Sequence, residues 1–364
     1  MNSSKNYVLL IGNGFDIAHG HETSYLDFAD YLLIQLSQRI FTHLSGALAS
    51  NPYFDDRANI NLRHIALNKR NDVNQDFQDL FEAFLKSETA NSHKYIHEVL
   101  IEKYLDKLQL ILANKFMAGL FRNRSSSNNW FDIENMYFKN VKDIALRKPY
   151  QNQRLKNLNK DFNDLKTELS DYLNNQNYSV NKEIHSYFGT LAKSIDSLTI
   201  INFNYTPTLD NYQKLFPVDC EIFNIHGTLK KGNIIFGYGN DQNDEYRRIL
   251  ELEEDEPLKN FKTFEYLRDG VYSSLLERIG NFSDYEVYVI GHSLALTDKT
   301  ILEEVFSRKE CSSINLLKRT DLKNESNKII ENFKKLSYAV ARVIEDDKIV
   351  RKIIVDQDRT MYFP

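Results

Sequence analysis

Polar residues of the types that bind phosphate or move protons follow several short apolar runs of the sequence. The first run, Tyr7 to Ile11, leads into two glycines spaced by one residue, Gly12 and Gly14. Glycines at the end of a buried strand let backbone amides approach a pyrophosphate at the start of the next helix. The full dinucleotide fingerprint needs a third glycine where Ile17 stands, so the simple dehydrogenase form is not present. The pattern predicts either a phosphate-contacting turn or a tight strand-to-helix turn.

Four later apolar runs end in comparable polar sequences. They are followed by NFNYTPTLD at 202–210, HG at 226–227, GYGND at 237–241 and GHSLALTD at 291–298. Ligands of open α/β sheets bind beyond the carboxyl ends of the strands, so these exits predict one shared site. The residues expected there are Gly12, Asn13, Gly14, Phe15, Asp16, His19, Thr23, Asn204, Tyr205, His226, Gly237, Gly291, Ser293 and Asp298.

The apolar runs themselves predict the strands that position these residues. They are Tyr7–Ile11, Leu198–Phe203, Glu221–Ile225, Asn233–Phe236, Glu286–Ile290 and Ser313–Leu317, with Lys348–Gln357 as an added edge strand. Strands alternating with helices indicate an α/β fold with a mainly parallel, Rossmann-like sheet. Between the first two runs, apolar residues recur at helical spacing. We therefore expect one α/β domain over residues 1–364, with a large helical insertion over residues 32–187.

Composition narrows the class of protein. Lys and Arg number 46 against 51 Asp and Glu, so the net charge is −5 and no positive field favours nucleic acid. The two cysteines, Cys220 and Cys311, form no CxxC pair, which excludes a zinc ribbon and predicts a reducing cytoplasm. The apolar run near the N-terminus is shorter than a signal peptide requires, and no stretch reaches a membrane span. We expect a cytoplasmic protein without a membrane partner.

A serine hydrolase is one alternative for the last motif. Ser293 follows a predicted strand in a G-x-S-x-A turn, close to the nucleophile elbow of α/β-hydrolases. The triad of that fold runs in the order Ser, acid, His, and no histidine follows His292. Ser293 is better interpreted as a hydroxyl and amide donor to a phosphate or ribose.

Metal chemistry has two weak candidates. His19 and His21 are two residues apart, have no thiolates nearby, and would point in different directions on a helix. Asp132 and Glu134 in WFDIE would share a face and could hold a divalent ion if that segment were extended. The alternative is a helix beginning near residue 133, capped by Asp132 or Asn129. We expect no metal site.

Six segments together resemble the AbiH family of bacterial abortive-infection proteins, which act against phages. They are IGNGFDIAHGHETSYLDF at 11–28, WFDIE at 130–134, NFNYTPTLD, IHG at 225–227, GYGND and IGHSLALTD at 290–298. They span most of the chain, and the first is the most specific. The resemblance implies a phage-defence effector that is silent until a phage-derived trigger, self-assembly into a homo-oligomer or another partner activates it. It leaves the biochemical activity open.

A more distant resemblance, to sirtuin-like NAD-binding domains, suggests the chemistry. The glycine turn, the segment at Asn204 and Tyr205, the HG pair and the late G-x-S motif occur in the same order. In that superfamily the Asn binds the ribose or a water and the His acts as base, so these catalytic roles would fall on Asn204 and His226. Thr206 replaces an expected acidic residue, and the zinc cysteines of deacetylases are absent, so a deacylase is not expected.

Three functions therefore stay open. The first is a hydrolase resembling NAD glycohydrolases that cleaves NAD or a related nucleotide, with Asn204 and His226 essential. The second is a sensor or interaction module that binds the nucleotide without turnover. The third is a metal-dependent nuclease built on Asp132 and Glu134, against which the negative charge argues.

Overall fold

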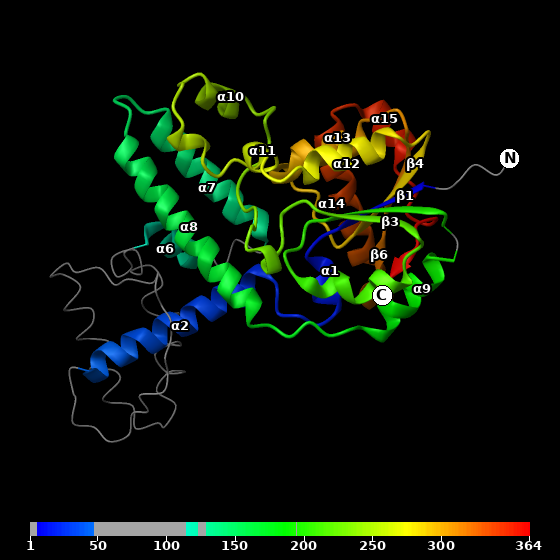
Figure 1. The fold of residues 1–364 in the computed structure, drawn as a ribbon, viewed down its shortest axis with the longest axis horizontal. Helices are drawn as coiled ribbons and strands as arrows, with labels where there is room; N and C mark the ends of the chain where they lie inside the picture. Colours follow the sequence, from blue (N-terminus) through cyan, green and yellow to red (C-terminus); the bar gives the residue numbers. More distant parts are fainter. Residues whose placement is uncertain (1–5, 47–113, 123–128, 194) are drawn as a thin grey trace. The chain divides into compact units, whose positions relative to one another are not determined.

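The computed structural model describes residues 6–46, 114–122, 129–193 and 195–364 (Figure 1). The chain folds into two compact units. The sheet unit comprises Met1–Thr23, Glu134–Gln151 and Leu173–Pro364, and the helical unit comprises Ser24–Ile133 and Asn152–Tyr172. Each is described by itself.

The sheet unit is built on five parallel strands. In spatial order they are β3 (Asp219–Asn224), β2 (Ser197–Asn202), β1 (Asn6–Ile11), β4 (Tyr285–Ile290) and β5 (Cys311–Leu316). The central strand β1 reads NYVLLI and is apolar on both faces, as a parallel strand covered by helices requires. Leu9 lies opposite Ile200 on one side and Tyr288 on the other. The predicted Rossmann-like α/β fold with a parallel sheet is confirmed.

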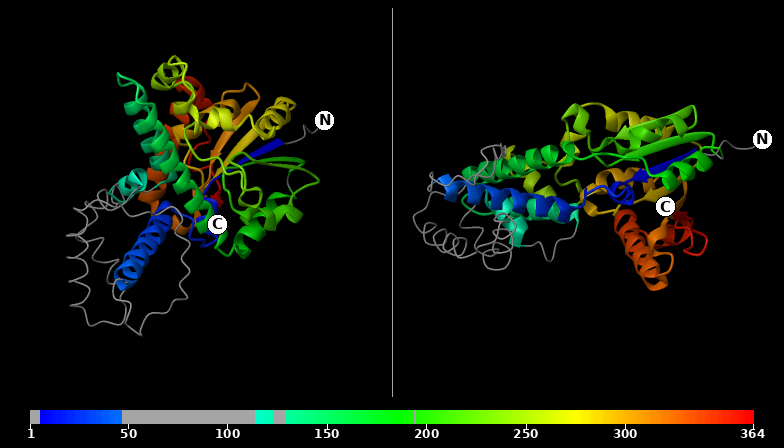
Figure 2. Two further views of the ribbon diagram at one scale, coloured as in Figure 1. Left: turned by 60° about the vertical axis from the view of Figure 1, so that its left-hand side comes forward. Right: turned by 90° about the horizontal axis from the view of Figure 1, so that it is seen from below.

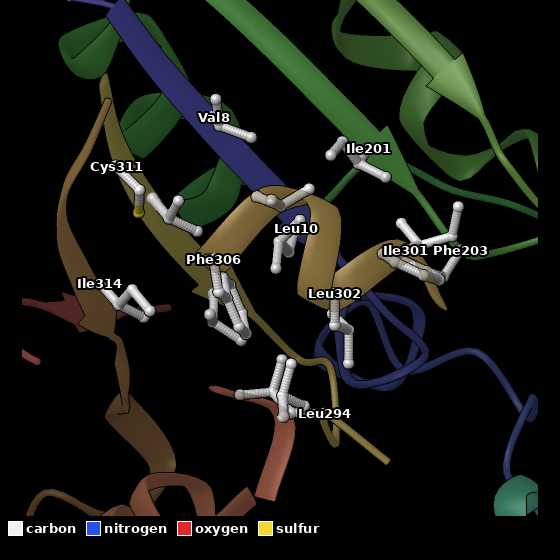
Figure 3. Packing of buried hydrophobic residues seen from close by; sticks show 14 of the residues in the cluster. Val8, Leu10, Ile201, Phe203, Leu294, Ile301, Leu302, Phe306, Cys311 and Ile314 are labelled. Atoms are coloured by element: carbon white, nitrogen blue, oxygen red, sulfur yellow. The ribbon is translucent and has the colours of Figure 1, made fainter. Parts of the chain in front are cut away.

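Successive strand residues pack against different helices. Val8 and Leu10 of β1 belong to a buried cluster with side chains of α12 (Val271–Gly280), α13 (Lys299–Phe306) and α14 (Ser326–Ile344). Figure 3 shows Leu302 and Phe306 of α13 in this cluster with Leu10. Each side chain of this kind stabilises the fold by about 1.5–3 kcal/mol when fully buried.

The opposite face of the sheet has its own core. Leu9 and Ile11 pack there with Ile184 and Phe188 of α9 (Lys182–Leu191). This alternation of β1 side chains between two helix layers follows from the two-residue period of a strand. Figure 2 shows the strands and their covering helices from two further directions.

The remaining elements of the sheet unit are short. They are α1 (Gly14–Ala18), α10 (Asp244–Leu250), α11 (Lys262–Glu265), α15 (Asp347–Ile353), the 3₁₀ turns η3 (Pro207–Leu215), η4 (Leu229–Lys231), η5 (Glu256–Leu258), η6 (Leu296–Asp298) and η7 (Thr320–Leu322), and a two-stranded sheet of β6 (Lys318–Arg319) and β7 (Tyr362–Phe363). Both cysteines are free; Cys220 lies on β3 and Cys311 on β5, the two edge strands of the sheet.

Helices make up the described part of the helical unit. They are α2 (Tyr25–Gly46), α6 (Lys115–Arg122) and portions of α7 (Trp130–Ala145) and α8 (Asn152–Asn174), which are both divided between the units. The ring of Phe28 packs 5.6 Å from Trp130 and 5.6 Å from Tyr172. Asn114 caps α6 by accepting a hydrogen bond from the Met117 amide at 2.8 Å. The predicted insertion over 32–187 falls partly on residues 47–113 and 123–128, outside the described residues.

Two expected strands are wrong. Residues 233–236 form an irregular segment whose last three residues are buried, and the Ile235 amide donates to the His226 carbonyl at 2.7 Å instead of entering a ladder. The run Lys348–Gln357 contains α15, whose start is capped by the Asp346 carboxylate, and only Ile354 pairs with a strand residue, Ile314. Apolar character alone did not separate a strand from a buried loop or a short helix.

Across the described ranges, no helix combines the length and apolar character needed to cross a membrane.

Candidate functional site at the carboxyl edge of the sheet

The glycine turn after β1 packs directly against the turn after β4. Gly12 donates its amide to the Ile290 carbonyl at 3.0 Å, and Gly14 donates to the Gly291 carbonyl at 2.8 Å. A Cβ on Gly14 would lie 2.6 Å from the Gly291 Cα, so no larger residue fits. These two glycines therefore serve the contact between neighbouring strand exits. Their predicted phosphate contact stays a prediction.

A chain of asparagines ties the exits of β1, β2 and β3 together. Asn202 donates from Nδ2 to the Asn224 side chain at 2.8 Å, and its own Oδ1 accepts from the Asn204 amide at 3.1 Å. Asn204 in turn donates from Nδ2 to the Gly12 carbonyl at 3.1 Å. Its Oδ1 has no partner among the described residues and remains an acceptor at the centre of this edge.

Three other predicted residues are engaged within the first motif. Thr23 donates its hydroxyl to Asn13 Oδ1 at 2.8 Å, and Asn13 donates back to the Thr23 carbonyl at 3.0 Å. His19 bridges the Phe15 carbonyl at 2.7 Å and the Tyr212 hydroxyl at 2.5 Å. These contacts hold the loop between α1 and α2 in place.

A buried acid–base group lies next to these exits. Lys262 of α11 donates to Glu134 Oε1 at 2.7 Å and to Asp298 Oδ1 at 2.6 Å. All three side chains are less than a tenth exposed. We call this group, together with His226, His292 and Tyr266, the Lys262 cluster. Such a concentration of buried ionisable groups at the ligand-binding edge of an α/β sheet is typical of a functional site.

The hydrogen bonds fix the tautomers of both histidines. Asp298 carries a carboxylate that accepts only, and His226 Nε2 lies 3.1 Å from its Oδ1, so the His226 proton is on Nε2. His292 accepts the Leu294 amide at Nδ1, 2.9 Å, and therefore directs its Nε2 proton toward Asp298 Oδ2, 3.5 Å away. The Tyr266 hydroxyl lies 3.2 Å from His226 Nε2. His226 Nδ1 has no hydrogen-bond partner among the described residues.

Burial and charge move the pKa values of the cluster in different directions. Burial lowers the pKa of His226 to about 4, the positive charge of Lys262 acts the same way, and Asp298 opposes both. Burial alone would raise the pKa of Asp298, but Lys262 and His226 hold it well below its usual range. Burial raises the pKa of Glu134, against the effect of Lys262. At neutral pH the cluster thus pairs a neutral imidazole with an ionised aspartate.

The remaining predicted residues lie around the cluster. Gly237 donates its amide to Glu134 Oε1 at 3.2 Å, and a Cβ there would clash with the Asn260 carbonyl oxygen. Tyr205 donates its hydroxyl to the Ile235 carbonyl at 3.1 Å. Gly291 takes a positive φ of 64° in the turn that brings His292 to Asp298.

The position of Ser293 does not match a nucleophile elbow. In that motif the serine itself takes the strained turn conformation. Here the positive φ, 55°, belongs to Leu294, whose side chain is buried in the core shown in Figure 3. Ser293 is exposed. The serine hydrolase alternative therefore has no support from the geometry.

The extended metal pair in WFDIE is also wrong. Residues 130–145 form α7, so Asp132 and Glu134 do not share a face. The helix begins at Trp130 instead of near residue 133, so Asp132 lies within its first turn, where its carboxylate accepts the Asn129 amide at 3.2 Å. Glu134 points to Lys262, whose ammonium group lies between the two carboxylates of Glu134 and Asp298. This removes the structural basis of the nuclease hypothesis.

Sequence reasoning missed three members of the cluster. Lys262 stands in no recognisable motif, and its nearest signal is an apolar context unusual for lysine, NFKTF at 260–264. His292 stands within the predicted strand-exit sequence GHSLALTD, where only Gly291, Ser293 and Asp298 were selected, and Tyr266 carries no signal. The last residue of GYGND, Asp241, lies elsewhere, on an open groove of about 600 Å³ that Arg247 and Arg308 also line.

Comparison of the chain with known proteins gives one family match and no match to a single curated protein or solved structure. No curated protein and no solved structure matches it, so the sirtuin-like resemblance stays a prediction. The family model described as bacteriophage abortive infection AbiH matches residues 8–318, which include every residue of the Lys262 cluster. The chain therefore belongs to the AbiH family of bacteriophage abortive-infection proteins.

Proposed function

We propose that this abortive-infection protein is an effector that binds NAD or a related nucleotide at the carboxyl edge of its sheet and hydrolyses the bond between ribose and nicotinamide. The observation that carries the proposal is the pair of His226 and Asp298. This pair leaves Nδ1 of His226 unprotonated, close to the carboxyl ends of β2, β3 and β4. The strand order β3-β2-β1-β4-β5 supports it, because sheets of this order bind nucleotides beyond their carboxyl ends.

The reaction assigns distinct roles to the two predicted catalytic residues. A water gives a proton to His226 Nδ1 as its oxygen bonds to the anomeric carbon of the ribose. The carbon–nitrogen bond breaks, and its electron pair stays on the nicotinamide nitrogen, which loses its positive charge. Asp298 keeps the imidazole in the required tautomer and stabilises it once protonated. Asn204 orients the water or a ribose hydroxyl through its Oδ1.

The other cluster residues support this geometry. Lys262 compensates the charge of Asp298, so that carboxylate stays ionised in a buried site. Glu134 fixes Lys262 from the other side and accepts the Gly237 amide. The cluster is closed to solvent, which suits an effector that must be silent before infection.

The same closure favours one alternative, a nucleotide sensor without turnover. His226 has a pKa of about 4 and is a weak base, and Gly12 and Gly14 already donate their amides to protein carbonyls. A sensor would bind the nucleotide and change the contact between the β1 and β4 exits without cleaving it.

NAD consumption by the purified protein separates these functions. Nicotinamide release is measured for the wild type, His226→Gln and Asn204→Ala, with and without lysate from phage-infected cells. A positioned base contributes ~10²–10⁴ in rate, so His226→Gln is expected to lose that factor while staying folded. His185→Ala, which changes an exposed histidine of α9, is the control and should keep full activity. Nucleotide binding without release by any protein would favour the sensor, and equal release by His226→Gln would contradict the proposed base.

A further inference from the structure

Asp16 carries a buried carboxylate oxygen that nothing in the described protein satisfies. The residue is 1% exposed, and Oδ1 has no hydrogen-bond partner. Buried polar atoms are hydrogen-bonded in the large majority of cases, and those that are not require an explanation. No described lysine, arginine or histidine forms an ion pair with Asp16, although it lies on the same sheet edge as the Lys262 cluster.

The other oxygen of Asp16 ends an ordered chain of donors. The Ser179 amide donates to His21 Nε2 at 3.1 Å, so the His21 proton is on Nδ1 and is directed at Thr208, 3.4 Å away. Thr208 and Thr206 hydroxyl oxygens are 3.2 Å apart, and Thr206 donates to Asp16 Oδ2 at 2.7 Å. Every donor in this chain points toward Asp16.

This chain favours the ionised form of Asp16. Burial raises the pKa of Asp16 to about 6, and the hydroxyls of Thr206 and Thr208 oppose that rise. Above that pH the group is a carboxylate with one oxygen saturated by donors and one oxygen unpartnered. A group that would satisfy Oδ1 must bring either a hydrogen-bond donor or a positive charge.

We propose that Asp16 is a catalytic residue whose carboxylate faces the positive charge of an NAD-class nucleotide. The inference rests on the proposed function and names the part of the ligand that this position recognises. In bound NAD⁺ the charge lies on the nicotinamide ring, and as the carbon–nitrogen bond breaks it moves to the ribosyl carbon. Asp16 stays ionised throughout and neither gives nor takes a proton. A preorganised carboxylate in a buried site stabilises that developing charge.

Binding of NAD⁺ and NADH by the full chain tests this assignment without relying on turnover. The two ligands differ in the charge of the nicotinamide ring, and both affinities are measured by calorimetry at pH 7.5. We expect the wild type to bind NAD⁺ about tenfold more tightly than NADH, because one charge-assisted contact accounts for that factor. Asp16→Asn should remove the preference. Asp210→Asn, at an exposed acid of η3, is the control and should keep it.

The hydroxyl that donates to Asp16 allows a second test, the pH dependence of the preference for NAD⁺ over NADH. A purely structural role of Asp16 would not change this pH dependence. Thr206→Val removes the donor to Oδ2 and should raise the pKa of Asp16, so the NAD⁺ preference disappears at pH 7 and returns toward pH 9. Thr206→Ser keeps the hydroxyl and should behave as the wild type. This arm also covers the case in which Asp16→Asn fails to fold.

The outcomes distinguish this inference from the proposed function. Equal affinity of the wild type for NAD⁺ and NADH would overturn the role of Asp16 and leave nucleotide binding intact. A preference retained by both Asp16→Asn and Thr206→Val would overturn it as well. Failure of the wild type to bind either nucleotide, with or without infected lysate, would overturn both proposals.

Discussion

Asp16 and Asp298 are two buried aspartates at the same edge of one sheet, and their environments differ in one respect. Asp298 has a lysine and two histidines around its carboxylate, whereas Asp16 has only hydroxyl donors and one unpartnered oxygen. Burial acts on both, yet the pKa of Asp298 is held well below its usual range and that of Asp16 rises to about 6.

The comparison separates a carboxylate that the protein satisfies from one that it leaves for a ligand. A counter-ion inside the protein stabilises the charge in every state, so Asp298 can orient His226 without a substrate. Asp16 lacks one, and its ionised form costs the folded protein free energy until a donor or cation arrives. Functional sites often carry such local costs.

Removing Lys262, the counter-ion of Asp298, should reduce the free energy of unfolding more than any other change proposed below. Lys262→Met leaves Glu134 and Asp298 facing each other in a buried site, and breaking a buried pair in this way costs about 3–5 kcal/mol of unfolding free energy. Urea unfolding at pH 7.5 measures the loss. Lys259→Met, which removes an exposed lysine from its pair with Glu256, should cost less than about 1 kcal/mol. Similar losses in the two variants would contradict the central position given to Lys262.

Lowering the pH should reduce the free energy of unfolding, because His226 is buried as a neutral imidazole. Its pKa is about 4 in the folded protein and near 6.5 when unfolded, so the unfolded chain binds more protons between these values. The stability contribution is therefore present above pH 6.5 and is lost as pH falls toward 4, by up to about 3 kcal/mol. Unfolding of wild type and His226→Gln across this range should show the steeper loss in the wild type. Parallel curves would show that His226 is not buried as a neutral group.

The pH dependence of stability that Asp16 causes should have the opposite sign to that of His226, so neutralising Asp16 should stabilise the protein at high pH. Its folded pKa of about 6 lies above the ordinary value of 3.8, so the folded state binds more protons between these values and stability falls as pH rises. Asp16→Asn should therefore be more stable than the wild type at pH 7.5, by about 2–3 kcal/mol, and the gain should disappear near pH 4. Urea unfolding at both pH values measures this, with Asp210→Asn as the matched control. A less stable Asp16→Asn with no pH dependence would show that Asp16 is an ordinary structural residue.

The sequence predicted the frame of this site better than its centre. Apolar runs located β1 to β5. The runs of β1 to β4 lead into Gly, Asn or His, and the parallel-sheet rule brought these four strand ends to one edge. Lys262 and Glu134 could not be found this way, because they reach the edge from helices α11 and α7, which the strand pattern does not describe. A pattern based on the ends of strands cannot predict side chains, such as these two, that helices bring to the site through tertiary packing.

The errors have similar causes. Residues 233–236 are as apolar as a strand because they are buried above the β3 exit, although they enter no ladder. The segment 347–353 has apolar residues at 349, 350 and 353, which is helical spacing, and Asp346 precedes it as a cap. That helix could have been predicted from the sequence.

The contact between Gly14 and Gly291 could not have been predicted, because each glycine alone is consistent with a ligand-binding turn.

The most direct test of the Lys262 cluster as the working site combines phage plating with NAD measurement in cells. Cells expressing the wild type, His226→Gln or the His185→Ala control are infected, with protein levels matched by immunoblot. We predict that the wild type and His185→Ala reduce plaque formation and deplete NAD after infection, and that His226→Gln does neither. Full protection by His226→Gln, with or without NAD loss, would show that the cluster is not where this protein acts against phage.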